Sequence, residues 1–386
     1  MALFFSRDTK VYIAYLDAAG AEAAGAVWEI PVLDGFSYSQ ATNTSEVTLN
    51  EMSAGNAVSR RGRKMFTDSY APAEWSFSTY ARPFRASGTV ASGGADDEAV
   101  QHCVEEPLWA MLVGNATYTA PVEGSSNAAW SDGFVHTDDG ATPPLGTGMT
   151  IDFSGSNLTE LAKANIYFVT GPSGTQVVYK IVNCTVNEAA IDFDIDGITT
   201  INWSGMGTII EEKVIGDVPA KTRYEGVTST SNFIRNRLTE LTAVSTSPTA
   251  TTYDLTLTGG SVNISNNITF LTPETIGTVN QPLGAVTGTR TIGGSFTCYL
   301  SDGALSSMDL FENIIEGTTT TTNSFNLGFK VGGDGNIPRI ELNAPQCHLE
   351  VPSHSIDDVI SVEVNFHALG STIDLTDELT VKYVGA

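Results

Sequence analysis

The sequence predicts a mainly β protein with two tandem copies of one sandwich or barrel unit, each with a single short helix. Three observations support this fold class. Apolar residues come mostly in short runs that alternate with polar residues, which is the pattern of half-buried strands. The 37 glycines, together with many threonine, serine and asparagine residues, are typical of turns between such runs. Finally, two long stretches of the chain match each other in one register.

Alternating runs occur from one end of the chain to the other, so we expect strands throughout. Along most of these runs the apolar residues tend to fall at every second position, which places them on one face of a sheet. The clearest runs are VWEIPV (27–32), EWSFSTY (74–80), YKIVNCTV (179–186), TYDLTLT (252–258), ISVEVNF (360–366) and LTVKYV (379–384).

Only two segments have clear helix signals. Residues 105–114, EEPLWAMLVG, begin with acidic residues and a proline and end in glycine. Residues 306–317, SSMDLFENIIEG, have serine caps, an early aspartate and a terminal glycine. We therefore expect one helix in each copy.

The internal repeat is clearest between residues 179–207 and 342–370, at a constant offset of 163. Six pairs of similar residues share this gapless register, which indicates a duplication. The pairs are Cys184 with Cys347, Asp194 with Asp357, Ile201 with Val364, Asn202 with Asn365, Trp203 with Phe366 and Gly207 with Gly370. The sequence therefore predicts a first copy at 1–213, a linker at 214–225 and a second copy at 226–386.

Elements further upstream keep the same order in both copies. Residues 27–43 resemble 252–267, each with an aromatic strand, a glycine turn and a second strand. The two predicted helices place Trp109 in the position of Phe311. The register of the repeat therefore extends beyond its best-matched segment.

The first copy is longer than the second because it has extra residues near 85–103 and 115–172. Long insertions are tolerated at surfaces, since loop entropy grows slowly with length. We expect these insertions to form surface loops or a small decoration.

The chain carries a large excess of acid, with 19 Lys and Arg against 44 Asp and Glu and a formal net charge of -25. Such a protein is repelled by phosphate backbones and anionic lipid, which argues against general nucleic-acid binding. Four cations nevertheless lie within residues 59–64, namely Arg60, Arg61, Arg63 and Lys64. Such a cluster can grip nucleic acid, stay solvated or contact another copy of the protein.

Four cysteines lie far apart with no C-x-x-C pair: Cys103, Cys184, Cys298 and Cys347. We expect free, mostly buried thiols rather than a zinc or redox site. The first ten residues contain too short an apolar run for a signal peptide, and no apolar stretch is long enough to span a membrane. We therefore expect a protein that is made and folded in a cytoplasm without membrane insertion.

No local motif predicts catalysis or a cofactor. Asp192, Asp194, Asp196 and Gly197 match the opening of a calcium loop, but its twelfth position is Trp203 where that loop requires glutamate. We interpret this segment as a strand with an acidic and an apolar face. We expect no enzyme activity, no cofactor and no metal.

Residues 32–52 (VLDGFSYSQATNTSEVTLNEM) and 59–84 (SRRGRKMFTDSYAPAEWSFSTYARPF) resemble the major tail tube proteins of long-tailed bacteriophages. The resemblance covers mainly the first 115 residues. It implies β-sandwich or barrel units with a flanking helix that join into rings, and rings that stack into the hollow tube of the virion tail. DNA passes through such a tube without specific binding.

The same resemblance implies the partners of this chain. Because the chain carries two units, we expect trimeric rings with pseudo-sixfold symmetry. Other tail proteins, such as the tape measure and terminator proteins, are further expected partners. An acidic wall repels phosphate at short range, so some acids are candidates for the lumen lining. These candidates are Asp192, Asp194, Asp196, Asp357 and Asp358.

In an acidic assembly protein, clustered cations find counter-charges on neighbouring copies. We therefore expect Arg60, Arg61, Arg63 and Lys64 to contact the next subunit or ring. The corresponding segment of the second copy keeps only Arg290, so two non-equivalent contacts per chain are expected. A solvated loop and a nucleic-acid grip are the alternatives.

Two other classes of function remain open at this point. A β-rich, immunoglobulin-like module that decorates a capsid or binds a surface would stay monomeric or cap a lattice. A glycan hydrolase with paired carboxylates would need a groove rich in aromatic residues, whereas the five tryptophans are spread along the chain.

Overall fold

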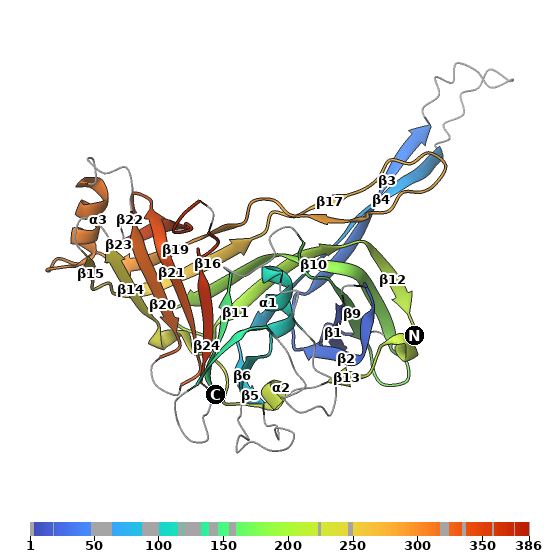
Figure 1. The fold of residues 1–386 in the computed structure, drawn as a ribbon, viewed down its shortest axis with the longest axis horizontal. Coiled ribbons are helices and arrows are strands. Elements are labelled where there is room, and N and C mark those ends of the chain that lie inside the picture. The colour runs from blue at the N-terminus through green and yellow to red at the C-terminus, as the bar shows by residue number, and fades with distance from the viewer. Residues whose placement is uncertain are drawn as a thin grey trace.

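The fold is mainly antiparallel β-structure, as predicted (Figure 1). Its strands pair into a first flanking sheet, a central sheet and a second flanking sheet, and long strands pass from one sheet to the next. The computed structural model describes residues 4–17, 19–47, 64–86, 100–114, 118, 133–138, 146–153, 160–222, 225–245, 250–316, 324–333, 337–356, 359–373 and 375–385.

The first flanking sheet is built from the first half of the chain. Its neighbours are antiparallel except β13, which runs parallel to β2. In spatial order its strands are β13 (Lys221–Thr222), β2 (Glu22–Ile30), β1 (Thr9–Leu16), β9 (Ala164–Thr170), the first part of β10 (Val177–Asp194) and β12 (Ile209–Lys213).

The second flanking sheet is its counterpart in the second half, but it ends in two strands from the first half. In spatial order its strands are β15 (Thr251–Tyr253), β14 (Glu240–Ser245), β20 (Phe325–Val331), β21 (Arg339–Leu349), β24 (Thr380–Val384), β8 (Gly146–Asp152) and β7 (Val135–Asp138).

The central sheet runs across both halves. Every second side chain along its strands packs into one large apolar core shared with the flanking sheets, as strand alternation dictates. In spatial order its strands are β3 (Ser37–Val47), β4 (Lys64–Tyr80), β11 (Thr200–Gly207), the second part of β10, β16 (Leu257–Ser265), β19 (Thr291–Tyr299), β23 (Ser361–Ala368) and β22 (Ser353–Ser355).

The remaining elements are short. Both predicted helices are confirmed: α1 (Glu106–Val113) lies between the two halves and α3 (Ser307–Glu316) at the far end of the second half (Figure 1). Gly114 ends α1 in the left-handed conformation, with φ of 71°. The others are α2 (Glu225–Thr228), the hairpins β5 (Pro83–Ala86) with β6 (Val100–Cys103) and β17 (Thr269–Leu271) with β18 (Gly284–Val286), and 3-10 turns at Ser6–Asp8, Ile215–Asp217 and Asn236–Leu238.

The strand pairings of the first half recur in the second. Pairs β1–β9, β9–β10, β10–β12, β10–β11 and β4–β11 correspond to β14–β20, β20–β21, β21–β24, β21–β23 and β19–β23. A bulge lies between Ile181 and Cys184 and again between Ala344 and Cys347. Each thiol donates to the carbonyl three residues earlier, at 3.4 and 3.7 Å. These matches support the predicted duplication, whose exact boundaries stay a prediction.

The expectation that residues 115–172 form only loops or a decoration is wrong for part of that segment. Strand β8 pairs with β24, with Ile151 opposite Val381, so it extends the second flanking sheet. Strand β9 is a buried inner strand between β1 and β10. Its apolar residues are consecutive because both faces of the strand are covered, so they lack the alternation that marks a surface strand.

All four cysteines are free and buried, as predicted. Burial raises the pKa of the Cys298 thiol to about 11 and that of Cys347 to about 12. Thiols that stay protonated at neutral pH react slowly, so these side chains act as small apolar core residues.

Two carboxyl groups are buried where α1 begins: Glu106 lies 2.8 Å from His102 Nδ1, and Glu105 precedes it. Glu105 is fully buried, and this burial raises the pKa of its carboxyl from 4.5 to about 8, although Arg82 nearby favours the charged form. In the unfolded chain the same carboxyl ionises near 4.5. Folding therefore keeps a proton on Glu105 across the range between these two pKa values, and stability falls as the pH rises through that range.

Replacing this acid by its neutral isostere tests the assignment. We expect Glu105→Gln to gain stability relative to the unsubstituted protein as the pH rises from 5 to 8, by up to about 1.4 kcal/mol per pH unit. The measurement is denaturant unfolding followed by tryptophan fluorescence at each pH. The exposed Glu240→Gln serves as the control and should show no such trend. A difference in the free energy of unfolding between Glu105→Gln and the parent that does not change with pH would contradict a buried, protonated Glu105 carboxyl.

Candidate functional site

One face of the central sheet turns away from the core, and within the described chain it carries small polar side chains, five carboxylates and no lysine or arginine. We call it the polar face. The strand pairings bring these side chains to the same side, since their neighbours along each strand are buried. It consists of Ser37, Ser39, Glu74, Ser76, Ser78, Tyr80, Glu188, Ala190, Asp192, Asp194, Thr200, Asn202, Ser204, Met206, Gly259, Ser261, Asn263, Ser265, Thr291, Gly293, Ser295, Thr297, Tyr299, Ser353, Ser355, Ser361, Glu363, Asn365 and His367.

Hydrogen bonds between neighbouring strands fix the polar face. Ser78 donates to Asn202 at 2.6 Å, and Asn202 in turn donates to Asp192 at 2.6 Å, so three strands are linked. Asn263 donates to Glu188 at 2.7 Å across the boundary between the two halves. Partial burial raises the pKa of Asp192, although its bond from Asn202 favours the charged form. The donors of Ser78, Asn202 and Asn263 are therefore used within the sheet.

The predicted acids do not all share this environment. Asp192 and Asp194 lie on the polar face at the end of β10, with Phe193 buried between them, which confirms the predicted strand. Asp196 lies in the following turn and forms an exposed ion pair with Arg237 at 3.1 Å. Asp357 and Asp358 lie outside the described residues.

The central sheet ends in two strands that each have a single strand neighbour in the described part of the chain. At one end β3 pairs only with β4, and at the other β22 pairs only with β23. A strand edge presents backbone N–H and C=O groups that can pair with another chain. The two edges lie at opposite ends of the sheet, so the contact that they favour is head to tail.

The middle of the sheet shows how such edges can join. Strand β10 of the first half pairs with β16 of the second from Glu188 opposite Ser265 to Asp194 opposite Gly259. We call this pairing the internal seam. Gly260 is required here because a Cβ at this position would lie 2.8 Å from the Ser295 carbonyl oxygen and 2.9 Å from the Phe193 ring.

Two hairpin arms project from the sheet (Figure 1). The first arm consists of residues 41–47 and 64–70, and the second arm of residues 266–290. The arms touch where the Tyr70 amide donates to the Asn280 carbonyl at 2.9 Å. Both expose apolar side chains, which a merely solvated loop does not need. These side chains are Val47, Met65 and Phe66 on the first arm and Leu271, Ile276, Val279, Leu283 and Val286 on the second.

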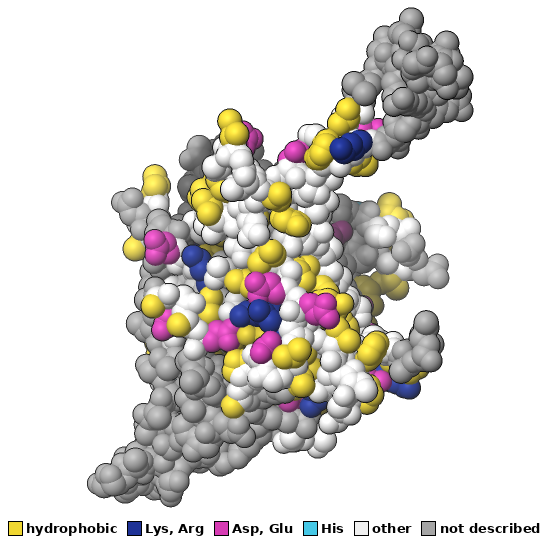
Figure 2. Space-filling model, turned by 90° about the vertical axis from the view of Figure 1, so that its right-hand side faces the viewer, with side chains coloured by type: hydrophobic (Ala, Val, Ile, Leu, Met, Phe, Trp, Pro, Cys, Tyr) yellow, Lys and Arg dark blue, Asp and Glu magenta, His cyan; other side chains and the backbone are white. Residues whose placement is uncertain are grey.

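The predicted cationic contacts lie in different surroundings. Arg60, Arg61 and Arg63 are outside the described residues, whereas Lys64 begins β4 on the first arm. Its ammonium lies 5.0 Å from the centre of the Phe66 ring. Figure 2 shows this arm with cationic and hydrophobic side chains next to each other.

Arg290, by contrast, is engaged within its own chain. Its guanidinium donates to Glu378 at 3.0 Å, stacks over Phe153 at 4.8 Å and is only 6% exposed. A contact of Arg290 with a neighbouring subunit therefore requires this ion pair to open, and it stays a prediction.

Sequence reasoning named two acids of the polar face and missed its neutral majority. The available signal was the recurrence of serine, threonine and asparagine at every second position, as in TINWSG (200–205) and SVNIS (261–265). The internal seam was also missed, because it joins strands about 70 residues apart in sequence.

Two comparisons with known proteins agree with each other. The profile of the family described as "Phage tail tube protein" matches residues 11–368. The "Tail tube protein pb6" of Escherichia phage T5 is 31% identical over 385 residues, a match that covers 98% of this chain and 75% of that protein. In the described part of the chain, no helix is both long and apolar enough to cross a membrane.

Proposed function

The chain belongs to the phage tail tube protein family, and on this premise we propose that three subunits join head to tail into a ring whose polar faces line the lumen. Members of this family are structural components of the bacteriophage tail and assemble into its tube. The observation that carries the proposal is the polar face, which is free of lysine and arginine in the described chain and ends in an open strand edge on each side.

The internal seam supplies the template for the joint between subunits. In the duplicated register, β3 corresponds to β16, and the segment 351–357 corresponds to the part of β10 that pairs with β16. The edge formed by Ser353 and His354 of one subunit is therefore suited to pair with the edge of residues 37–41 of the next. Repetition of this joint continues the central sheet around a ring.

Ring closure follows from the number of units. Each chain brings two similar units that are already joined at the internal seam, so three chains bring six and give pseudo-sixfold symmetry. A closed ring leaves neither edge of the central sheet exposed, which removes that aggregation hazard of the isolated subunit.

Placement of the polar face toward the lumen fits the passage of DNA. Phosphate groups bind strongly to lysine and arginine because cation contacts release counterions. A face with carboxylates such as Asp194 and Glu363, and no such cation among its described residues, offers DNA few anchoring points. The exposed Arg237, which lies beside Asp194, already forms an ion pair with Asp196 at 3.1 Å. The tube can therefore transmit the genome without holding it.

The two arms are suited to axial contacts between rings. They project from the body, expose apolar side chains and, on the first arm, carry Lys64 beside the sequence cluster of Arg60, Arg61 and Arg63. An acidic neighbouring ring offers counter-charges to these cations. Stacking should therefore depend on salt.

Charge placed at the proposed joint tests ring formation. Ser39→Asp together with Ser353→Asp sets two carboxylates near each other at each joint, which destabilises cross-strand pairing by roughly 0.2–1 kcal/mol per pair. Ser39→Lys with Ser353→Asp should restore it. We expect the ring concentration threshold, measured by analytical ultracentrifugation, to rise in the first variant and recover in the second.

A control for these variants is Ser295→Asp, which adds a carboxylate to the polar face inside the chain's own sheet, opposite the neutral Ser261 and Asn365. It should assemble close to normally. Equal assembly of all the charged variants would show that the joint lies elsewhere.

Charge reversal on the polar face tests its place in the lumen. Tubes of Asp194→Lys with Glu363→Lys should retain short duplex DNA at low salt and release it as salt rises, whereas unsubstituted tubes should retain none. Co-sedimentation of labelled DNA with the tubes measures this. Glu240→Lys with Asp254→Lys makes the same charge change at exposed positions of the second flanking sheet. DNA retention by tubes of this control, with none by tubes of Asp194→Lys with Glu363→Lys, would place the polar face outside the tube.

Removal of the cationic cluster tests stacking. A variant with Arg60, Arg61, Arg63 and Lys64 all changed to Ser should form rings but few tubes, because the counter-charge contacts between rings are lost. Negative-stain electron microscopy distinguishes rings from tubes. Lys330→Ser with Lys382→Ser, on the second flanking sheet, should leave tubes unchanged. Tubes of normal length from the cluster variant would refute the docking role.

A further inference from the structure

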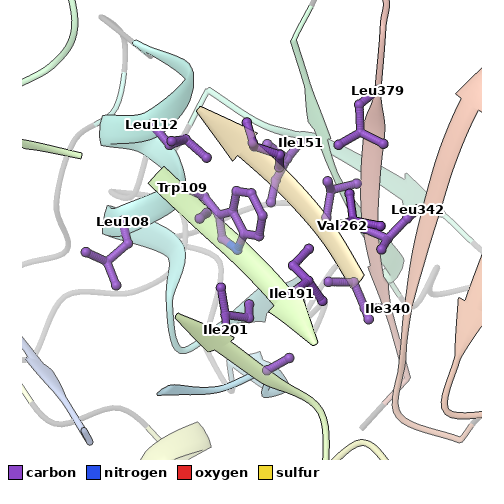
Figure 3. Close-up of a cluster of buried hydrophobic side chains, with 14 of the residues drawn as sticks. Leu108, Trp109, Leu112, Ile151, Ile191, Ile201, Val262, Ile340, Leu342 and Leu379 are labelled. Carbon is purple, nitrogen blue, oxygen red and sulfur yellow. The ribbon is translucent and has the colours of Figure 1, made fainter. Parts of the chain in front are cut away.

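Helix α1 seals the internal seam from the core side. All eight of its residues are buried, although it belongs to the first half and touches the second. Trp109 donates from Nε1 to the Tyr383 hydroxyl at 2.9 Å, and Asn266 donates to the Leu112 carbonyl at 2.9 Å. Figure 3 shows Trp109 against the strands of the seam, between Leu112 and Ile191. The helix thus binds both partners of the seam at once.

Helix α3 is the counterpart of α1 but lacks the second partner. Leu310 is buried like Leu108, whereas Phe311, in the position of Trp109, and Ile314 are only half-buried. Phe311 packs edge-on against His354 of β22, with the ring centres 5.3 Å apart. The helix therefore lies beside the open β22 edge, at the outer end of the second half (Figure 1).

The first half of the chain carries the counterpart of the surface on which α1 packs. We call this counterpart, which includes Phe36, Tyr38 and Val214, the seat. Strand β12 pairs with β10 as β24 pairs with β21, and this register, continued by one residue beyond Lys213, places Val214 where Tyr383 lies. Val214 is 66% exposed and Ile215 is 39% exposed. Tyr38 lies on the core side of β3, in the position that Val262 has on β16, and Phe36 immediately precedes β3. Both aromatic side chains are only half-buried, whereas Val262 is buried.

We propose that α3 of each subunit docks on the first half of the next subunit, with Phe311 against Val214 and the aromatic pair Phe36 and Tyr38. This rests on the proposed ring and adds its lateral contact on the core side of the sheet. The occupant is a second copy of this chain, because α1, the counterpart of α3, already packs across the equivalent joint within one chain. The apolar side chains of the seat lie beside the exposed Glu212, which stands where Val381 lies in the second half.

The chemistry of this contact differs from that of the arms. Helix α3 contains acidic residues and no lysine or arginine, so its docking relies on burial of Phe311 and Ile314 rather than on ion pairs. Ring formation should therefore tolerate salt that weakens stacking.

Two complementary variants test the contact. Phe311→Asp spoils the helix and leaves the seat intact, while Val214→Asp spoils the seat and leaves the helix intact. Each alone should stay monomeric at concentrations at least tenfold above those at which the parent forms rings. Mixed in equal amounts, they should form a two-chain species of twice 40.8 kDa and nothing larger, because only one joint per pair is intact. Native mass spectrometry measures both results.

Controls separate a lost contact from a lost fold. Val214 is mostly exposed, so Val214→Asp should unfold at the same temperature as the parent, and Phe311→Leu should keep ring formation. Ile373→Asp adds the same charge at a fully exposed position and should assemble normally. Rings formed by Phe311→Asp or Val214→Asp as readily as by the parent would overturn the seat and leave the proposed function standing. Failure of the parent protein itself to form rings would overturn both.

Discussion

The open edges of the central sheet are the constraint on which the rest of the structure depends. A bare strand edge exposes backbone donors and acceptors that readily recruit other chains. Within the chain this demand is met at the internal seam, where β10 and β16 pair over seven residues. The bulge before Cys184 lets β10 leave the flanking sheet and enter the central one. One strand thereby holds the sandwich and the seam together.

The same strands separate the core from the polar face, residue by residue. Trp203 is buried and donates to Thr79 at 2.9 Å, while the adjacent Asn202 and Ser78 lie on the polar face. A slip of one residue would exchange these two sets and place tryptophan where the serine row now lies. Correct register is therefore a condition for both stability and surface chemistry, and the large aromatic residues of the core fix it.

Local patterns in the sequence predicted the alternating strands, both helices, the buried thiols and the register around Cys184 and Cys347, but not β8 and β9, because periodicity and capping act over a few residues. They did not predict that β8 would extend the sheet of the second half, since that pairing joins residues more than 200 positions apart. They also did not predict the engagement of Arg290 with Glu378. An isolated arginine in sequence does not show which carboxylate it will meet.

A tube wall that lets DNA pass needs to avoid cations more than it needs many acids. Repulsion between a carboxylate and a phosphate is screened within about 8 Å at physiological salt, so acids act only on DNA that comes close to the wall. A single lysine at the wall, by contrast, would form a direct contact that gains from counterion release. On the polar face, Asn202 and Ser78 direct donors to neighbouring side chains, which limits what they can offer a passing phosphate. With the polar face toward the lumen, as proposed, the neutral serine and asparagine rows contribute to unhindered passage together with the acids beside them.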